Sequence, residues 1–263
     1  MRKGRGLRAS ALWGRRINFT SSLIKRATKH VDSLQKQLFK TINECQLRKV
    51  IRFQLLLKNS YFNKILALYK VAHINSGKKT AGVDRIKIKL SDQRQISKIM
   101  DNLARDLNDD KWKPKPVRRI HIPKPDGTKR PLGIPTQYDR VVQFVLNTIL
   151  DVSVEHLIHS HKLGSYGFRK YHSTADAVNN LAVYARQGKH AIAIEADISK
   201  CFDRITHEYI NNLLEGNLIK PFVSKLLTAG NVDTDGLLAT CDVGTPQGGV
   251  ISPTISNLVL RSI

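Results

Sequence analysis

Apolar residues between positions 21 and 73 recur every three to four positions, the spacing of helices that bury one face. The pattern predicts two or three amphipathic helices, with basic residues in the intervening positions. The apolar series consists of Val31, Leu34, Leu38, Ile42, Leu47, Val50, Ile51, Leu55, Leu56, Ile65, Leu66 and Leu68. Packing of several helices therefore organises the front of this chain.

Charge is distributed very unevenly along the sequence. The 263 residues include 44 Lys and Arg against 21 Asp and Glu, a net charge of +23. Residues 1–85 hold 20 basic and 3 acidic residues, a net +17, which leaves +6 for the remainder. Such an excess indicates a polyanionic partner, and nucleic acid is the leading candidate, with a merely basic surface as the alternative. The front third is the main electrostatic footprint.

Cysteine usage and hydropathy exclude several classes of protein. Cys45, Cys201 and Cys241 are far apart and odd in number, so neither a disulfide framework nor a zinc cage is expected. No run approaches the ~18 apolar residues of a membrane span, and no apolar signal region follows the basic start. We expect no membrane partner and a cytoplasmic, bacterial location. The first acidic residue is Asp32, so a plastid or mitochondrial transit peptide is the alternative, and a nucleic-acid-binding arm explains the basic start equally well.

The remainder alternates between helical and extended patterns. Residues 75–84 read as a loop; their Gly-Lys-Lys-Thr lacks the upstream glycine of a P-loop. Helices are predicted at 91–107, 139–156 and 174–187. Residues 111–130 carry eight cations and four prolines around an Asp126-Gly127 turn, which predicts a β-hairpin, and a second hairpin is expected around residues 233–236.

Residues 191–198 are apolar on both faces up to Glu195 and Asp197, as in a buried strand with carboxylates at its end. Asp197 is the best candidate for a metal ligand, although a hydrogen-bonded strand-end aspartate is the blander interpretation. The other acidic groups suggest no metal site. Asp109-Asp110 reads as a solvated helix end, and Asp233 and Asp235 as turn formers. The histidines at 156, 159 and 161 match no standard metal spacing.

Six sequence blocks, in order, resemble those of group II intron reverse transcriptases. They are GKKTAGVD at 77–84, VRRIHIPKPDGTKRPLGIPT at 117–136, DRVVQ at 139–143, GFR at 167–169, EADI followed by CFDRI at 195–205, and GTPQGGVISP at 244–253. The resemblance extends over about residues 17–260. It implies an α+β fold with the fingers and an incomplete palm of a right-hand polymerase, preceded by a helical N-terminal extension. The implied regions are a basic extension with a template loop at 1–85, fingers at 86–190 and a partial palm at 191–263.

The resemblance also implies roles for individual residues. Asp197 would be the first catalytic aspartate, binding Mg²⁺ together with the Ile198 carbonyl. Phe202 would lie under the sugar of the incoming dNTP, although core packing is the alternative. The residues expected to bind the dNTP are Arg118, Lys124, Arg130, Phe202 and Gln247. Those expected to contact the RNA template are Gly77, Lys78, Lys79 and Thr80.

The resemblance is incomplete in one respect that bears on activity. The Tyr-Ala-Asp-Asp strand, which completes the metal site in the family, does not occur in the 263 residues. The prediction is therefore a truncated or split RNA-directed DNA polymerase that is inactive alone. Its partners would be group II intron RNA or another RNA template, a DNA primer, dNTP and a second polypeptide. The alternatives are a non-catalytic maturase-like protein that assists splicing and a nonfunctional remnant of a mobile element.

Smaller departures from the family concern single loop positions. Arg85 stands where the family favours glycine, and Lys170 and His172 depart from its pattern beside the GFR block.

Overall fold

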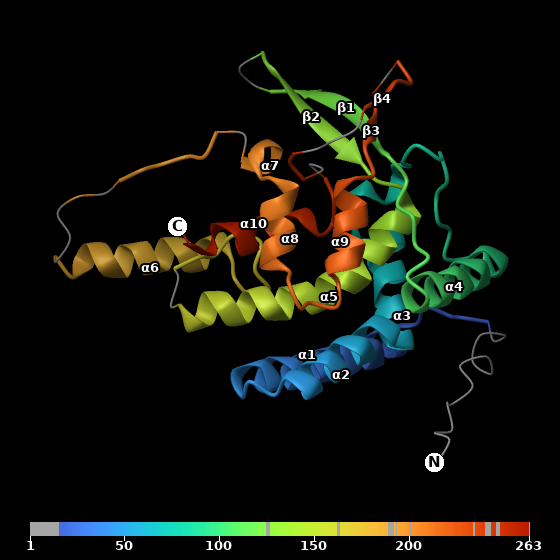
Figure 1. The fold of residues 1–263 in the computed structure, drawn as a ribbon, viewed down its shortest axis with the longest axis horizontal. Helices are drawn as coiled ribbons and strands as arrows, with labels where there is room; N and C mark the ends of the chain where they lie inside the picture. Colours follow the sequence, from blue (N-terminus) through green and yellow to red (C-terminus); the bar gives the residue numbers. More distant parts are fainter. Residues whose placement is uncertain are drawn as a thin grey trace.

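The computed structural model describes residues 16–124, 127–161, 164–188, 192, 194–199, 201–233, 235–239, 243–245 and 248–262. Helices form the body of the molecule, and a small sheet stands at one end of it (Figure 1). The helices are α1 (Ser21–Asn43), α2 (Leu47–Asn59), α3 (Tyr61–Tyr69), α4 (Gln93–Asn108), α5 (Gln137–Ser160), α6 (Thr174–Arg186), α7 (Cys201–Arg204), α8 (His207–Leu213), α9 (Lys220–Leu227) and α10 (Ser252–Val259). Shorter helical turns are η2 (Lys70–Ile74), η3 (Ser76–Lys79) and η4 (Leu260–Ser262).

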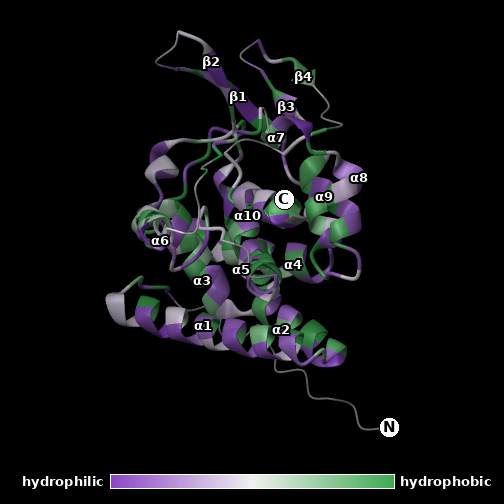
Figure 2. Cartoon of the chain, turned by 90° about the vertical axis from the view of Figure 1, so that its left-hand side faces the viewer, coloured by the Kyte–Doolittle hydropathy of each residue, from purple (hydrophilic) through white to green (hydrophobic). Residues whose placement is uncertain are grey.

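The predicted front helices are present as α1, α2 and α3. The side chain of Thr20 caps α1 by accepting a hydrogen bond from the Leu23 amide, which satisfies one of the free N–H groups of the first turn. Ala27, Val31 and Leu38 form the buried face of α1, and this helix packs against α2, α3 and α5. Green and purple alternate along α1 and α2 in Figure 2, as expected of amphipathic helices with solvated basic faces.

Helix α5 is the centre of the hydrophobic core. It packs against α1, α2, α3, α4 and α10, and its apolar residues from Val141 to Ile158 are largely buried. Thr136 caps it by accepting a hydrogen bond from the Asp139 amide. By length and composition α5 could cross a membrane, but 61% of its most apolar window is buried inside the protein. That burial is typical of a core helix.

The sheet contains four strands in the order β2-β1-β3-β4. They are β1 (Val117–Pro123), β2 (Lys129–Ile134), β3 (Asn231–Val232) and β4 (Leu238–Ala239). β1 and β2 pair antiparallel with Ile120 opposite Leu132, which confirms the predicted hairpin, although Asp126 of its expected turn lies outside the described residues. β3 and β4 form the second predicted hairpin, and β3 runs parallel to β1. Helices with a small mixed sheet make this an α+β fold.

The strand predicted at 191–198 is wrong for the residues that the structure describes. Residues 192 and 194–199 adopt no strand, and the side chains of Ile192 and Ile194 are 82% and 88% exposed. In Figure 1 this segment runs outside the helices, between α6 and α7. A strand that is apolar on both faces needs covering on both, and none of the described strands pairs with this segment. Helix α6, just before it, likewise contains no buried residue.

Candidate nucleic-acid and nucleotide site

The loop that links η2 to α4 is fixed to the start of α5. The Arg140 guanidinium donates hydrogen bonds to the carbonyl oxygens of Gly77 and Thr80, both at 2.9 Å. One helical turn earlier, the Gln137 amide donates to the Lys78 carbonyl at 2.8 Å. Three of the four residues expected to contact the template, Gly77, Lys78 and Thr80, are thereby held through their main chain.

Two further contacts fix the next residues of the same loop. A Cβ atom on Gly82 would lie 2.6 Å from the main chain of Thr136, so only glycine allows this close approach to α5. Arg118 of β1 donates to the Ala81 carbonyl at 2.9 Å. Lys79 remains exposed, whereas the Lys78 ammonium donates to the His73 carbonyl at 2.7 Å. The loop therefore presents Lys79 outward on a rigid support.

The β1–β2 hairpin brings its expected cations onto one face. Side chains alternate along a strand, so Arg118 shares a face with Ile120, and Arg130, opposite Ile122 in the register, shares it too. Lys124 continues the alternation directly after β1 and is exposed, as is Arg130. Because Arg118 already binds the Ala81 carbonyl, it connects the hairpin to the loop, in addition to any role toward a nucleotide.

The segment around Gly244 and Gly248 lies between α7 and β2. The amide of Thr245 donates to the Phe202 carbonyl at 2.7 Å. At Gly248 the φ angle is +105°, and a Cβ there would lie 2.6 Å from the Gly133 carbonyl oxygen, so both the conformation and the contact require glycine. Phe202 is half-buried in α7. Gln247, the residue expected to contact the incoming nucleotide, lies outside the described residues.

These three parts line one cavity of about 400 Å³. Its walls are the loop residues 75–77 and 80, the hairpin residues 120 and 132–135, Arg140, and Gly248 with Val250. On the opposite face of the hairpin a second cavity of about 240 Å³ is lined by Arg119, Asp203 and Thr245, among others. Residues from four distant stretches of the sequence thus converge on one region, with Lys79 exposed on the loop that forms one wall.

Comparisons with known proteins identify the family of this chain. Residues 122–263 match the family model described as reverse transcriptase (RNA-dependent DNA polymerase), and residues 22–102 match the N-terminal domain of reverse transcriptase. The chain belongs to the reverse transcriptase family.

Its relatives place it among the group II intron-encoded members of that family. It is 37% identical over 168 residues to the putative COX1/OXI3 intron 1 protein of Saccharomyces cerevisiae, covering 62% of this chain and 20% of that protein. It is 31% identical over 200 residues to the group II intron-encoded protein LtrA of Lactococcus lactis, covering 74% and 32%. Protein YkfC of Escherichia coli is 32% identical over 194 residues, covering 71% and 50%. The chain thus spans between a fifth and a half of the length of these relatives.

The expected metal centre does not assemble from the described residues. Asp197 and Ile198 lie in the exposed segment before α7, not at the end of a buried strand. Within the part of the chain that the structure describes, no three His, Cys, Asp or Glu side chains gather closely enough to hold a metal ion. Two magnesium ions require several carboxylates around them, so the described residues by themselves do not fit the family's metal pair.

Sequence reasoning missed the importance of the polar residues in the first half of α5. Gln137, Asp139, Arg140 and Gln143 are all buried. Gln137 and Arg140 bind the loop at 77–80, whereas Asp139 and Gln143 bind the segments at 112–115 and 250. Asp139 accepts hydrogen bonds from the Trp112 indole at 3.0 Å and from the Thr136 hydroxyl at 2.5 Å. Burial raises the pKa of Asp139, and these hydrogen bonds oppose the rise. The signal was available, because four polar residues within seven positions of an apolar helix require internal partners.

Proposed function

We propose that this chain forms the part of a group II intron-type RNA-directed DNA polymerase that binds the template and the incoming nucleotide. The observation that carries the proposal is the cavity of about 400 Å³ where the loop 75–84, the hairpin and the segment after Gly248 meet. Lys79 would neutralise the template backbone, and Lys124 and Arg130 would bind the triphosphate of a dNTP. Phe202 and Gln247 would also contact the nucleotide.

The proposal divides the chain into three regions. Residues 1–85 would be the basic N-terminal extension with its template loop, 86–190 the fingers, and 191–263 part of the palm. The packing of α1, α2 and α3 before the loop, and the hairpin within the second region, support this division. The net charge of +17 in residues 1–85 suits contacts with intron RNA, as expected of a maturase.

Catalysis would require more than these residues supply. Asp197 and the Ile198 carbonyl would provide one part of a Mg²⁺ site, and the remaining carboxylates would come from a longer chain or a second polypeptide. A polypeptide of these 263 residues would bind RNA template, DNA primer and dNTP without extending the primer.

Primer extension on an RNA template with Mg²⁺ tests the proposal. We expect no product from the 263-residue polypeptide alone and product when a polypeptide carrying the remaining palm and thumb is added. A Lys124→Ala, Arg130→Ala double variant should then raise the KM for dNTP, whereas the control Lys98→Ala, at an exposed position of α4, should not. DNA synthesis by the 263-residue polypeptide alone would refute the proposal that its metal site is incomplete.

A non-catalytic, maturase-like role is the second candidate, and the exposure of Asp197 favours it. Under this function the chain binds intron RNA and assists splicing without polymerisation. Asp197→Ala separates the two: splicing support that survives the substitution agrees with RNA binding alone, whereas splicing support that is lost with unchanged RNA affinity excludes it.

A further inference from the structure

The guanidinium of Arg140 is buried beneath the loop, and the proposed polymerase chemistry gives it no part. The residue is 7% exposed, and its side chain donates to the carbonyls of Pro135, Gly77 and Thr80 at 3.1, 2.9 and 2.9 Å. Burial lowers the pKa of Arg140, and the nearby Asp84 carboxylate opposes that change. Burying a cation costs free energy unless acceptors surround it, and here the loop's own carbonyl oxygens are the acceptors.

Gln137 uses both ends of its amide in the same way. Its Oε1 accepts a hydrogen bond from the Ile88 amide at 2.6 Å, and its Nε2 donates to the Lys78 carbonyl at 2.8 Å. Together, Gln137 and Arg140 turn the carbonyls of residues 77, 78 and 80 toward α5. Carbonyl oxygens would repel a phosphate, so this arrangement leaves the outer side of the loop to the exposed Lys79.

The same helix also fixes the opposite wall of the cavity. Gln143, one turn after Arg140 and fully buried, accepts a hydrogen bond from the Val250 amide at 2.8 Å. One polar stripe along α5 therefore sets the spacing between the loop and the segment that follows Gly248. Substituting a residue of this polar stripe would therefore shift one wall of the cavity, although the stripe residue itself contacts no ligand.

We propose that Arg140 and Gln137 are positioning residues that hold loop residues 77–80 so that Lys79 meets the template strand, and that neither touches nucleic acid. This inference rests on the proposed function of the loop. It predicts that a neutral, buried glutamine controls an electrostatic contact made by a lysine on the outer side of the loop.

A double-mutant cycle on the 263-residue chain tests the inference, with a fluorescein-labelled single-stranded RNA as the probe. Lys79→Ala should weaken binding by about fivefold at ~0.1 M salt and lower the salt slope by about 0.7, the values for one phosphate contact. Arg140→Met should produce the same change. The double variant should bind no more weakly than either single variant, because the second substitution removes a contact that is already lost.

Three further variants separate positioning from direct contact and from misfolding. Gln137→Leu carries no charge change and should still lower the salt slope by about 0.7. Arg140→Lys keeps the cation but loses the planar fork that spans two carbonyls, so it should behave like Arg140→Met. Arg94→Met is the matched control, because it removes an exposed arginine on α4. Any loss of RNA affinity that it causes should add to the loss caused by Lys79→Ala. In the Gln137 and Arg140 variants, amide hydrogen exchange should accelerate at residues 77–82 and remain unchanged in α4 and α10.

Three results would overturn the inference. Additive losses from Lys79→Ala and Arg140→Met, with Arg140→Lys near wild type, would mean that Arg140 binds RNA itself. A salt slope unchanged by Gln137→Leu would mean that the loop does not depend on its main-chain support. If Lys79→Ala in the otherwise wild-type chain changes neither RNA affinity nor its salt slope, the proposed role of the loop is refuted, and the inference with it. This outcome differs from additive losses, in which Lys79→Ala does weaken binding.

Discussion

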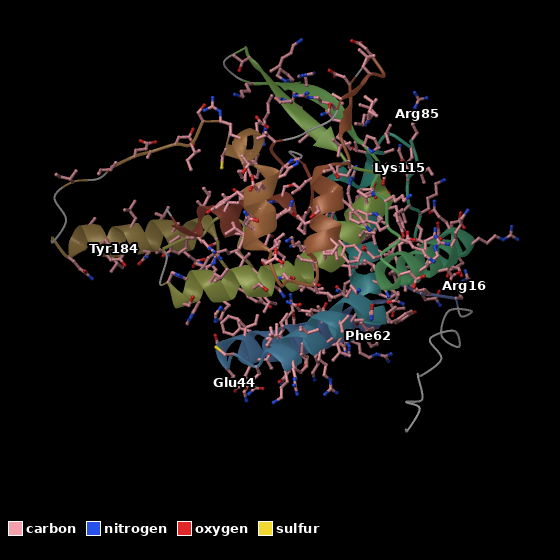
Figure 3. All side chains as sticks on the ribbon, in the orientation of Figure 1. Arg16, Glu44, Phe62, Arg85, Lys115 and Tyr184 are labelled. Carbon is pink, nitrogen blue, oxygen red and sulfur yellow. The ribbon has the colours of Figure 1, made fainter. Side chains whose placement is uncertain are left out.

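Gly82 and Arg85 lie three residues apart in one loop, and the backbone favours glycine at both positions. At Gly82 any side chain would meet the Thr136 main chain at 2.6 Å. At Arg85 the backbone has a φ of +57°, a left-handed conformation that glycine adopts without strain. The departure from the family's glycine at this position therefore carries a backbone cost. Figure 3 shows Arg85 on the outer side of this loop, near Lys115. Tyr171, beside the GFR block, has a similar φ of +66°.

Replacing Arg85 with glycine should therefore stabilise the protein. Relief of the left-handed conformation gains about 1–2 kcal/mol, and the added freedom of glycine in the unfolded chain returns about 0.5–1 kcal/mol of it. We expect the free energy of unfolding to rise by about 0.5 kcal/mol, measured by urea denaturation. Lys98→Gly, in the interior of α4, should instead lower it by about 1 kcal/mol. A loss of stability in both variants would show that the Arg85 side chain makes a compensating contact.

Lys64 is a second residue whose environment costs stability. Its side chain is 1% exposed, and burial, with a smaller contribution from Lys58, lowers its pKa to about 8. Below pH 8 the lysine is protonated in both the folded and unfolded states, so the full cost of the buried ammonium applies. Between about pH 8 and 10.5 the folded state releases the proton first, and stability rises with pH.

Lys64→Met should remove this cost while keeping a similar volume. We expect the variant to unfold with roughly 1–3 kcal/mol more free energy than the wild type near pH 7, and the difference should shrink toward pH 10. Urea denaturation at several pH values measures it. The matched variant Lys98→Met, exposed on α4, should show a small difference that does not depend on pH. If the difference in unfolding free energy between Lys64→Met and the wild type stayed constant with pH, the lowered pKa of Lys64 would be contradicted.

At the scale of elements, sequence patterns correctly predicted the helices and the hairpin that depend mainly on nearby residues. The apolar periodicity of residues 21–73 and 139–156 gave α1, α2, α3 and α5, since each of these helices finds a covering partner within the described residues. The proline-bounded alternation at 111–130 likewise gave β1 and β2. The buried strand at 191–198 failed because a strand depends on neighbours that its own sequence does not contain. The polar stripe of α5 was missed because its partners lie up to 107 residues away.

This difference between α5 and the segment 192–199 is measurable. Ile149→Ala removes a side chain that is fully buried in α5 and should cost about 2–5 kcal/mol of unfolding free energy. Ile194→Ala removes one that is 88% exposed, and the change should lie within about 0.5 kcal/mol of zero. The amides of residues 194–199 should also exchange without protection in the isolated polypeptide. A large loss for Ile194→Ala would mean that this segment packs in solution.

At the scale of the whole molecule, the position of the charge matters more than its sum. Of the net +23, residues 1–85 contribute +17, and Arg48, Lys49 and Arg52 are exposed cations within α2. If this region carries the RNA footprint, changing all three to glutamine should lower the salt slope of RNA binding by about 2, since each lost phosphate contact subtracts about 0.7. Affinity at ~0.1 M salt should fall more than tenfold.

The matched control removes the same charge elsewhere. Glutamine at Lys98, Lys111 and Arg186, all exposed and outside residues 1–85, also lowers the net charge from +23 by three. Nonspecific attraction to a uniformly basic protein would weaken RNA binding equally in both triple variants, because it depends on net charge. A localised footprint predicts that only the α2 triple variant changes the slope strongly. Fluorescence anisotropy with labelled intron RNA, measured over a series of salt concentrations, distinguishes the two, and equal slopes would exclude α2 as part of the RNA-binding surface.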